Sequence, residues 1–489
     1  VEDLEASLKN LSKLIYIPED HIEEALNRSK KQLSHLPLSL KSNLSWEELS
    51  RLKVHTPDLP GVSAEDSFLR HYTAGNAVAH LLGYVRRPSE TDLTENPEDS
   101  FLNLPGIRLG KTGIEKKLEK ILRGVSGVEE IEVTARHKKV RTLSQHLSKE
   151  GQSVRLSIDL ELQKKAQQLL EPYKSGAAVI MDVKTGQILS FSSEPTFDNN
   201  AFVQRLPPEI WKSLSQDPLS PLLNKVTAGT YAPGSTFKMV VTLAALESGL
   251  ITKHDSVTCF GHVFISNHRF HCHKRGGHGR MSLLSALAKS CDIYFYDLAL
   301  KVGIERIAKM AKILGLGEIT ALQFPGEKSG LIPTKSWKKE RYNKPWLIGE
   351  TVLASIGQGY LLTTPLQLAT MTARIASGKM ISPSLLFDPS TTDPDPLPIS
   401  EKNLQLIRDG MRDVVWHPFG TAKSVRSSDL KIAGKTGTAQ VRRIKERERK
   451  QGVKRNQDLD WKYRDHALFV GFAPVEAPRY ATAVVIEHG

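Results

Sequence analysis

The stretch that most constrains this chain lies at 231–239, where a serine and a lysine stand three residues apart at the start of an apolar helical pattern. It reads Tyr231-Ala-Pro-Gly-Ser-Thr-Phe-Lys-Met239. The Pro-Gly pair predicts a turn, and the apolar spacing after Lys238 predicts a buried helix that opens at Ser235. Positions i and i+3 of a helix share one face with Cβ atoms roughly 5–6 Å apart, so we expect Ser235 Oγ and Lys238 Nζ to meet. A buried, neutral lysine can deprotonate a serine.

A Ser-x-x-Lys spacing alone is weak support for catalysis, because Ser336-Trp-Lys-Lys339 has it too, on a basic segment expected to be exposed. A second motif, Ser290-Cys-Asp292, follows an apolar helical run. The Ser290 hydroxyl can relay a proton to a leaving amine, and Asp292 can hold Lys238 or a substrate amide by hydrogen bonding. The alternative for this motif is a simple helix cap.

A third motif, Gly434-Lys-Thr-Gly-Thr-Ala439, lies on a predicted strand. Lys435 supplies a fixed positive charge, and the hydroxyls of Thr436 and Thr438 can bind a carboxylate. Gly437 allows a ligand to approach the backbone closely. Backbone N–H groups of Ser235 and Thr438 can together form an oxyanion hole.

The length of 489 residues predicts two or more domains, and 25% charged with 39% hydrophobic residues is typical of globular protein. The net charge of +13 favours anionic surroundings. No motif supports nucleic-acid binding, and we expect none. No apolar run reaches the roughly 18 residues that span a bilayer. Because the chain starts at Val1 and stops within a predicted strand, we expect a natural protein that is longer at both ends.

A domain boundary is predicted near Gln152. Short amphipathic helices are expected in the first 50 residues, and the chain beyond the boundary predicts an α+β fold around one sheet. We expect strands at 154–158, 176–183, 187–191, 431–441, 467–472 and 480–486, and helices at 160–170, through most of 243–314, and at 366–375 and 400–415. Segments 388–398 and 442–460, rich in Pro and Asp or in charge, are expected to be mobile insertions.

The three motifs, in this order and at these separations, resemble the transpeptidase domain of penicillin-binding proteins. Further stretches that resemble it are Leu156-Ser-Ile-Asp-Leu-Glu-Leu-Gln163, Gly176-Ala-Ala-Val-Ile-Met-Asp182, Lys328-Ser-Gly-Leu-Ile-Pro333, Ile356-Gly-Gln-Gly359 and Phe469-Val-Gly-Phe-Ala-Pro474. Residues 52–149 are similar to the pedestal of class B members. Gly110-Lys-Thr-Gly-Ile-Glu115 and the aspartate at 292, where the wider family more often has asparagine, resemble the elongation-type group, often called penicillin-binding protein 2.

The resemblance implies an antiparallel sheet flanked by helices at 152–489, and an elongated, non-catalytic N-terminal pedestal of the dimerisation type at 1–151 with a helical head at about 1–57. It also implies DD-transpeptidation of peptidoglycan. Ser235 would attack the penultimate D-Ala carbonyl of a stem peptide, with Lys238 as base, Ser290 as proton relay and Lys435 as electrostatic clamp. Substrate would be held at Thr436, Gly437 and Thr438.

The resemblance further implies inhibition by β-lactams, a single-pass anchor in the bacterial inner membrane and residence of the catalytic domain in the periplasm. Its implied partners are a SEDS-type glycan polymerase and elongation scaffold proteins. The alternatives are a division-type class B transpeptidase, a hydrolase of the same fold such as a carboxypeptidase or β-lactamase, and a non-catalytic scaffold or β-lactam sensor.

All three cysteines, Cys259, Cys272 and Cys291, fall in one span, with His278 between the last two. Thiolates with an imidazole suit tetrahedral zinc. Some elongation-type relatives resemble this arrangement, with a metal ligand inside the second motif. We therefore expect structural Zn²⁺ on these four residues and no organic cofactor. Rival ligands are His268, His271 and His273, and the alternatives are buried free cysteines or a Cys259–Cys272 disulfide.

Overall fold

The computed structural model divides the chain into two compact units. The first comprises Val1–Thr73, Leu82–Ser153 and Asp198–Pro207, and the second comprises Ala74–Leu81, Val154–Phe197 and Pro208–Gly489. The residues that the structure describes are 4–31, 38, 40–59, 61–64, 69–104, 106–134, 139–203, 206–389, 393–442, 448 and 453–489. Each unit is described by itself.

The first unit begins with three helices, α1 (Leu4–Leu14), α2 (Glu19–Lys31) and α3 (Trp46–His55). Amphipathic spacing explains their packing, since Leu11 and Leu52 lie in one buried apolar cluster. A capping box starts α3, because the Ser45 side chain accepts from the Glu48 backbone and the Glu48 side chain accepts from the Ser45 backbone. The other elements are η1 (Thr56–Asp58), β1 (Val85–Arg86), α5 (Glu90–Glu95), η3 (Ser100–Asn103), β2 (Leu109–Gly110), α6 (Gly113–Lys117), α7 (Glu119–Leu122), β3 (Val128–Val133), β4 (Lys139–His146) and α9 (Asn200–Val203).

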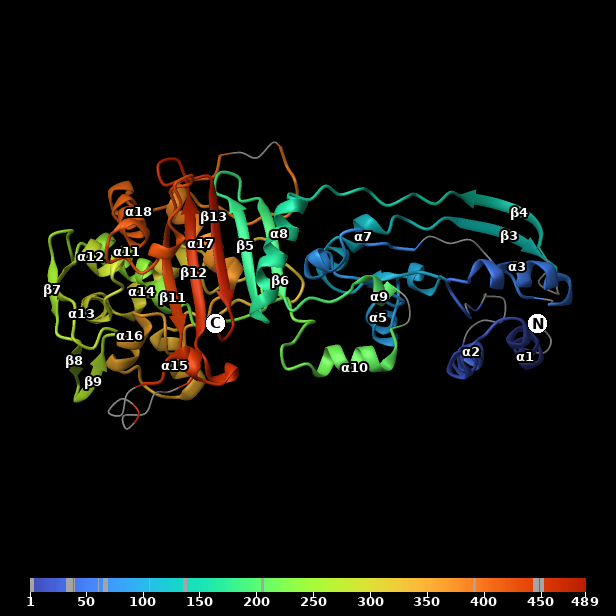
Figure 1. Ribbon diagram of the computed structural model, residues 1–489. Coiled ribbons are helices and arrows are strands. Elements are labelled where there is room, and N and C mark those ends of the chain that lie inside the picture. The colour runs from blue at the N-terminus through green and yellow to red at the C-terminus, as the bar shows by residue number, and fades with distance from the viewer. Residues whose placement is uncertain are drawn as a thin grey trace. The chain divides into compact units, whose positions relative to one another are not determined.

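The second unit is built on one five-stranded antiparallel sheet in the order β11-β12-β13-β5-β6 (Figure 1). Its strands are β5 (Gly176–Asp182), β6 (Ile188–Glu194), β11 (Ala433–Ala439), β12 (His466–Ala473) and β13 (Tyr480–Ile486). Strands from the two ends of this unit meet because β13 pairs with β5 over their whole length. Within the described residues β11 pairs with β12 alone, so β11 lies at an edge of the sheet.

Helices pack on this sheet. The helix α8 (Leu160–Leu170) packs on β6, α17 (Pro365–Ser377) crosses β13, β5 and β12, and α18 (Glu401–Trp416) packs on β11 (Figure 1). Further helices are η2 (Gly75–Val78), α4 (Ala79–Leu82), η4 (Glu171–Tyr173), α10 (Pro208–Gln216), η5 (Gly234–Phe237), α11 (Lys238–Glu247), α12 (Leu283–Ala288), α13 (Asp292–Val302), α14 (Ile304–Ile313), α15 (Lys335–Tyr342), α16 (Ile348–Ala354), η6 (Lys423–Val425), η7 (Asn456–Asp458) and η8 (Trp461–Tyr463). The predicted α+β class, an antiparallel sheet flanked by helices, is confirmed.

Two sequence predictions of secondary structure are wrong. The span 243–314 was expected to be mostly helical, but it holds two two-stranded antiparallel sheets. β7 (Ser256–Cys259) pairs with β10 (Gly279–Ser282), and the hairpin of β8 (His262–Ile265) and β9 (His268–His271) lies between them in sequence. Helical flanks dominate the composition of that span, whereas glycines with positive φ, such as Gly261 and Gly277, turn the chain between short strands. The strand expected at 154–158 forms only an isolated bridge from Leu156 to Leu386.

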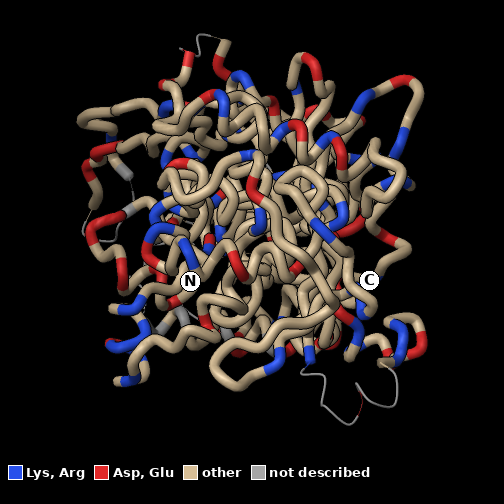
Figure 2. The backbone as a smooth tube through the Cα atoms, turned by 90° about the vertical axis from the view of Figure 1, so that its left-hand side faces the viewer, with Lys and Arg blue, Asp and Glu red and all other residues tan. Residues whose placement is uncertain are grey.

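Charged side chains of both signs are distributed along the chain. Figure 2 shows Lys and Arg interspersed with Asp and Glu along the backbone. Within the described ranges, no helix has both the length and the apolar character that a bilayer span requires. Of the two predicted insertions, residues 390–392, 443–447 and 449–452 lie outside the described residues.

Candidate active site

Ser235 and Lys238 lie at the beginning of a buried helix, as their spacing predicts. Ser235 is half-buried within η5, and Lys238 is the first residue of α11 and is fully buried. Lys238 Nζ donates to Ser290 O at 2.8 Å, to Ser290 Oγ at 3.1 Å and to Asp292 Oδ1 at 2.7 Å. These acceptors use all three protons of an ammonium. Among the described residues Lys238 therefore bonds the second motif, and the expected contact with Ser235 Oγ is not made.

Close backbone approaches hold the serine turn in place. Gly234 N–H donates to Gly357 O at 3.0 Å, and a Cβ at Gly357 would lie 2.1 Å from Gly234 O. A Cβ at Gly234 would lie 2.4 Å from Thr438 O. Both glycines have positive φ, +55° and +70°. The backbone can pack this tightly only because neither residue has a side chain.

The second motif joins two helices. Ser290 follows α12 in the left-handed region, with φ +53°, and its N–H donates to Leu287 O at 3.2 Å. Asp292 opens α13, where a carboxylate is favoured by the helix dipole. Left-handed backbone is uncommon for serine and is found preferentially at functional sites. This conformation lets both the hydroxyl oxygen and the carbonyl oxygen of Ser290 accept hydrogen bonds from Lys238.

The third motif lies on β11 with alternating exposure. Lys435 is fully buried, and its Nζ donates to Ser290 Oγ at 2.9 Å and to Thr436 O at 3.0 Å. Thr436 is half-buried and Thr438 is exposed. Gly437 is buried beneath the serine turn, where a Cβ would lie 3.0 Å from Pro233 O. The structure therefore brings all three motifs to one site.

Two polar residues at this site were missed by the sequence analysis. Thr421, in the loop after α18, shares a hydrogen bond of 2.7 Å with Thr436 through their hydroxyls. Gln358 Nε2 donates to Thr438 O at 3.0 Å. No local pattern marks Thr421, because it reaches β11 only through tertiary packing. Gln358 lies in the stretch 356–359 that carried part of the resemblance, but no role was assigned to it.

The charges of this network shift its pKa values in opposite directions. Complete burial, together with the nearby Lys238 ammonium, holds the pKa of Lys435 well below its ordinary value. Burial by itself would raise the pKa of Asp292, but the charge of Lys238 and the hydrogen bond of His273 outweigh it and hold that pKa well below its usual range. Asp292 is therefore a carboxylate, and it anchors Lys238.

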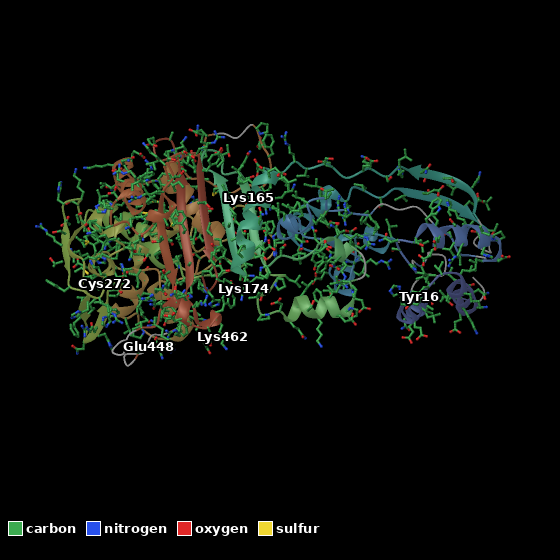
Figure 3. All side chains as sticks on the ribbon, in the orientation of Figure 1. Tyr16, Lys165, Lys174, Cys272, Glu448 and Lys462 are labelled. Carbon is green, nitrogen blue, oxygen red and sulfur yellow. The ribbon has the colours of Figure 1, made fainter. Side chains whose placement is uncertain are left out.

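The three cysteines and His278 form one cluster next to the second motif. Their ligand atoms all lie within 4.8 Å of one another, and all three cysteines are free and buried. Cys259 ends β7, Cys272 follows β9, and Cys291 caps α13. Figure 3 labels Cys272 among the side chains of the β7 to β9 region. A hydrogen bond with Cys291 lowers the pKa of the Cys272 thiol, which favours the thiolate that binds metals.

The rival histidines are placed differently. His273 Nδ1 lies 3.3 Å from Asp292 Oδ2, and its backbone N–H donates to the same oxygen at 2.8 Å. Cys272, His273 and Asp292 thus form a second group of possible ligands. His268 is exposed on β9. His271 and His268 belong to neither group among the described residues.

Family models match nearly the whole chain. The penicillin binding protein transpeptidase domain matches residues 176–489, and the penicillin-binding protein dimerisation domain matches residues 1–156. The peptidoglycan D,D-transpeptidase MrdA of Haemophilus influenzae is 35% identical over 503 residues, covering 100% of this chain and 76% of that protein. MrdA of Escherichia coli K12 is 33% identical over 507 residues, covering 100% of this chain and 79% of that protein.

Solved structures show the same similarity in three dimensions. The penicillin-binding protein PBP2 of Helicobacter pylori, in complex with MreC, has a TM-score of 0.85 and 32% identity, covering 99% of this chain and 88% of that chain. PBP2 of Pseudomonas aeruginosa, in complex with WCK 5153, has a TM-score of 0.74 and 36% identity, covering 87% of each chain. With both domain models matched and the three motifs assembled at one site, this chain belongs to the penicillin-binding protein family, in its elongation-type PBP2 group.

Proposed function

We propose that this chain is a peptidoglycan DD-transpeptidase that cross-links stem peptides during cell elongation and is acylated by β-lactams at Ser235. The observation that carries the proposal is the convergence of two buried lysines on one hydroxyl: Lys238 and Lys435 both donate to Ser290 Oγ, beside the helix that Ser235 opens. The matches to MrdA and PBP2, which extend along nearly the whole of this chain, support the elongation-type assignment over a division-type enzyme or a scaffold.

In the first step Ser235 Oγ attacks the penultimate D-Ala carbonyl, and its proton passes to a neutral Lys238. To act as the base, Lys238 first loses one of its three ammonium protons to solvent, which leaves a lone pair on Nζ that accepts the proton of Ser235. The oxyanion is stabilised by N–H groups of Ser235 and Thr438. The C–N bond breaks as the leaving D-Ala amine takes a proton through Ser290, which leaves an ester on Ser235.

In the second step the amine of a neighbouring stem attacks that ester. A new amide forms as the incoming amine gives a proton through Ser290 to Lys238, the C–O bond to Ser235 breaks, and Ser235 Oγ takes that proton back from Lys238. Substrate carboxylate would lie against Thr436 and Thr438, with the charge of Lys435 behind them. Because β11 pairs only with β12 among the described residues, a substrate backbone can add to its other edge as a strand.

The test is intact-mass analysis after incubation with a fluorescent penicillin, followed by peptide mapping and a wash of several hours. A stable adduct on Ser235, absent in Ser235→Ala, is expected, since a transpeptidase deacylates slowly. Rapid loss of the adduct would instead support a hydrolase. No adduct on a folded chain would support the scaffold or sensor alternative.

We also propose that Cys259, Cys272, His278 and Cys291 hold a structural Zn²⁺. The fit rests on distances: His278 Nδ1 lies 3.5 Å from Cys272 Sγ and 3.7 Å from Cys259 Sγ. Tetrahedral zinc with Zn–S of about 2.3 Å and Zn–N of about 2.0–2.1 Å requires S···N separations of roughly 3.5 Å. Such a metal supplies cross-linking rather than catalysis, because four protein ligands leave no open position. It would brace the backbone that carries Ser290.

For partners and location the support comes from relatives. The Helicobacter pylori PBP2 structure is a complex with MreC, and another match, with a TM-score of 0.71 and 28% identity, comes from a peptidoglycan synthase complex that couples polymerization and crosslinking. We infer that this chain assembles with an elongation scaffold protein and a SEDS-type glycan polymerase, and works in the periplasm from a single-pass inner-membrane anchor. Co-purification with each partner from membranes tests this inference.

A further inference from the structure

Four aromatic side chains in the second unit form a cluster that we call the aromatic shelf: Trp337, Tyr342, Trp346 and Tyr360. Tyr360 is at its centre, with ring centroids 5.1 Å from Trp337, 5.7 Å from Tyr342 and 6.5 Å from Trp346. The shelf is not a closed core, since Tyr342 is 48% exposed and the other three rings are only half-buried. None of the three catalytic motifs uses it.

Polar contacts fix the rings in place. Trp346 Nε1 donates to Thr351 Oγ1 at 2.8 Å. Glu350 accepts from Tyr360 OH at 3.4 Å and from the buried Lys338. Rings that are held in this way lose little conformational freedom when a ligand stacks on them, which favours binding.

The shelf is tied to the catalytic serine turn on both sides of Tyr360. On one side, Gly357 O accepts the N–H of Gly234 at 3.0 Å. On the other, Thr363 and Tyr231 exchange backbone hydrogen bonds of 2.8 and 2.9 Å. Tyr360 is three residues from each anchor, a span of at most roughly 11 Å. The shelf therefore lies within reach of Ser235 and is fixed relative to it.

The surroundings of the shelf point to a class of ligand. Lys339, Arg341 and Lys344 are exposed on and after α15 and outnumber the exposed Glu340 between them, so the fringe beside the rings is basic on balance. The C–H faces of pyranose rings stack on tyrosine and tryptophan, whose ring faces carry partial negative charge. A cationic fringe attracts carboxylates attached to such a polymer. An N-acetylated amino-sugar chain that bears acidic stem peptides offers both features.

We propose that the aromatic shelf binds the glycan strand of peptidoglycan and presents the attached stem peptide to Ser235. A stem of about four or five residues spans at most roughly 13–18 Å, which exceeds the roughly 11 Å that can separate Tyr360 from either anchor, so a stem held at the shelf can reach the serine turn. This inference rests on the proposed transpeptidase function. It assigns the shelf a positioning role, because the shelf touches the polymer and not the reacting carbonyl.

The test compares wild type with Tyr342→Ala, using the full chain. The matched control is Tyr173→Ala, since Tyr173 is a 54% exposed tyrosine on η4, a segment that no catalytic motif includes. The probe is purified glycan strands stripped of their stem peptides, with binding read from intrinsic tryptophan fluorescence. We expect Tyr342→Ala to bind at least about 10-fold more weakly, the effect of losing one stacking interaction of about 1.4 kcal/mol. Acylation by fluorescent penicillin is expected to stay unchanged.

Two further variants separate binding from folding. Tyr342→Phe keeps the ring and is expected to bind stripped glycan as wild type does, and Arg341→Glu is expected to weaken only strands that carry stem peptides. Equal binding of stripped glycan by wild type and Tyr342→Ala, or binding that needs the stem peptides, would overturn the inference. So would an equal loss in Tyr173→Ala. Absence of a penicillin adduct in wild type would instead refute the transpeptidase function, so the two failures are distinguishable.

Discussion

Lys435 Nζ lies 2.9 Å from Ser290 Oγ, so the third motif reaches the second through a lysine that is fully buried. Lys238 donates to the same hydroxyl at 3.1 Å. A serine hydroxyl that accepts hydrogen bonds from two lysines keeps its own proton free to donate, and it can take a proton from a lysine as it gives its own away. This relationship makes Ser290 the junction of the site, and the first two predictions follow from it.

Replacing Ser290 by Ala is expected to lower the rate of acylation by about 10²–10⁴-fold, because a positioned proton relay contributes about that much. The measurement is the second-order rate constant with a fluorescent penicillin. Ser248→Ala is the control, since Ser248 is an exposed serine at the far end of α11 whose hydroxyl donates to Ala244 O. A Ser290→Ala variant that acylates like this control would remove Ser290 from the mechanism.

The buried Lys435 predicts an alkaline limb in the pH profile of acylation. Below its pKa the lysine is charged and attracts the β-lactam carboxylate; as pH rises through that pKa the charge and the attraction are lost. Because burial holds this pKa well below the ordinary value of about 10.4, the rate is expected to fall at correspondingly lower pH. Lys435→Arg keeps its charge and is expected to lack this limb. The measurement is the acylation rate constant of wild type and of Lys435→Arg from pH 6 to 10. A fall in rate at the same pH in both proteins would contradict the assignment.

Gly357→Ala is expected to destabilise the chain by more than about 3 kcal/mol, because its Cβ would lie 2.1 Å from Gly234 O. Gly359→Ala is the matched control, with φ +80° and a nearest contact of 3.6 Å to Leu353 Cβ. It carries the same left-handed backbone strain without the clash, so a loss of about 1–2 kcal/mol is expected. Urea unfolding and acylation rates are the measurements, and equal losses would show that strain alone explains both.

Thr421→Val is expected to weaken β-lactam binding about 2- to 10-fold before acylation, because it removes the neutral hydrogen bond that positions the Thr436 hydroxyl for the carboxylate, a contribution of about 0.5–1.5 kcal/mol. Thr421→Ser keeps the hydroxyl and is expected to behave as wild type. The dissociation constant that precedes acylation, from stopped-flow measurements, reports the effect. Wild-type binding by the valine variant would leave Thr421 as a packing neighbour of Thr436.

Removing the proposed metal is expected to lower the melting temperature and slow acylation. Metal analysis is expected to find about one zinc per chain in wild type and none in Cys272→Ala. His268→Ala, which changes an exposed rival histidine, is expected to retain it. A decrease of at least about 5 °C in Cys272→Ala corresponds to roughly 1–2 kcal/mol. Metal-free wild type with a Cys259–Cys272 disulfide would favour the oxidised alternative.

The sequence predicted those features that local spacing determines. Ser235 and Lys238 at the start of a buried helix, the hairpin of β5 and β6, and the antiparallel sheet all follow from periodicity, turn residues and the resemblance. We also expected one cluster of Cys259, Cys272, His278 and Cys291, and the structure has it. Whether these residues bind metal stays a prediction.

What the sequence could not predict depends on distant packing. The hydrogen bond of Lys238 to Asp292 was one of the two roles expected for that carboxylate, but the bonds of Lys238 to Ser290 instead of Ser235 depend on how α12 and α13 meet α11. Thr421 reaches Thr436 across the loop after α18, a contact with no local pattern. The strands β7 to β10 were missed because each has only four residues, too few for an alternating pattern to outweigh the helical flanks.

The edge of β11 that no strand covers in the described part of the chain has a consequence for folding and assembly. A strand left open to accept the backbone of a substrate is equally open to the backbone of another copy, which is how aggregation begins at sheet edges. β11 contains Gly434 and Gly437, which weaken strand formation, and a charged lysine between them. We infer that this composition limits self-association through β11. The same short strand must therefore remain accessible to the substrate and also keep the chain soluble.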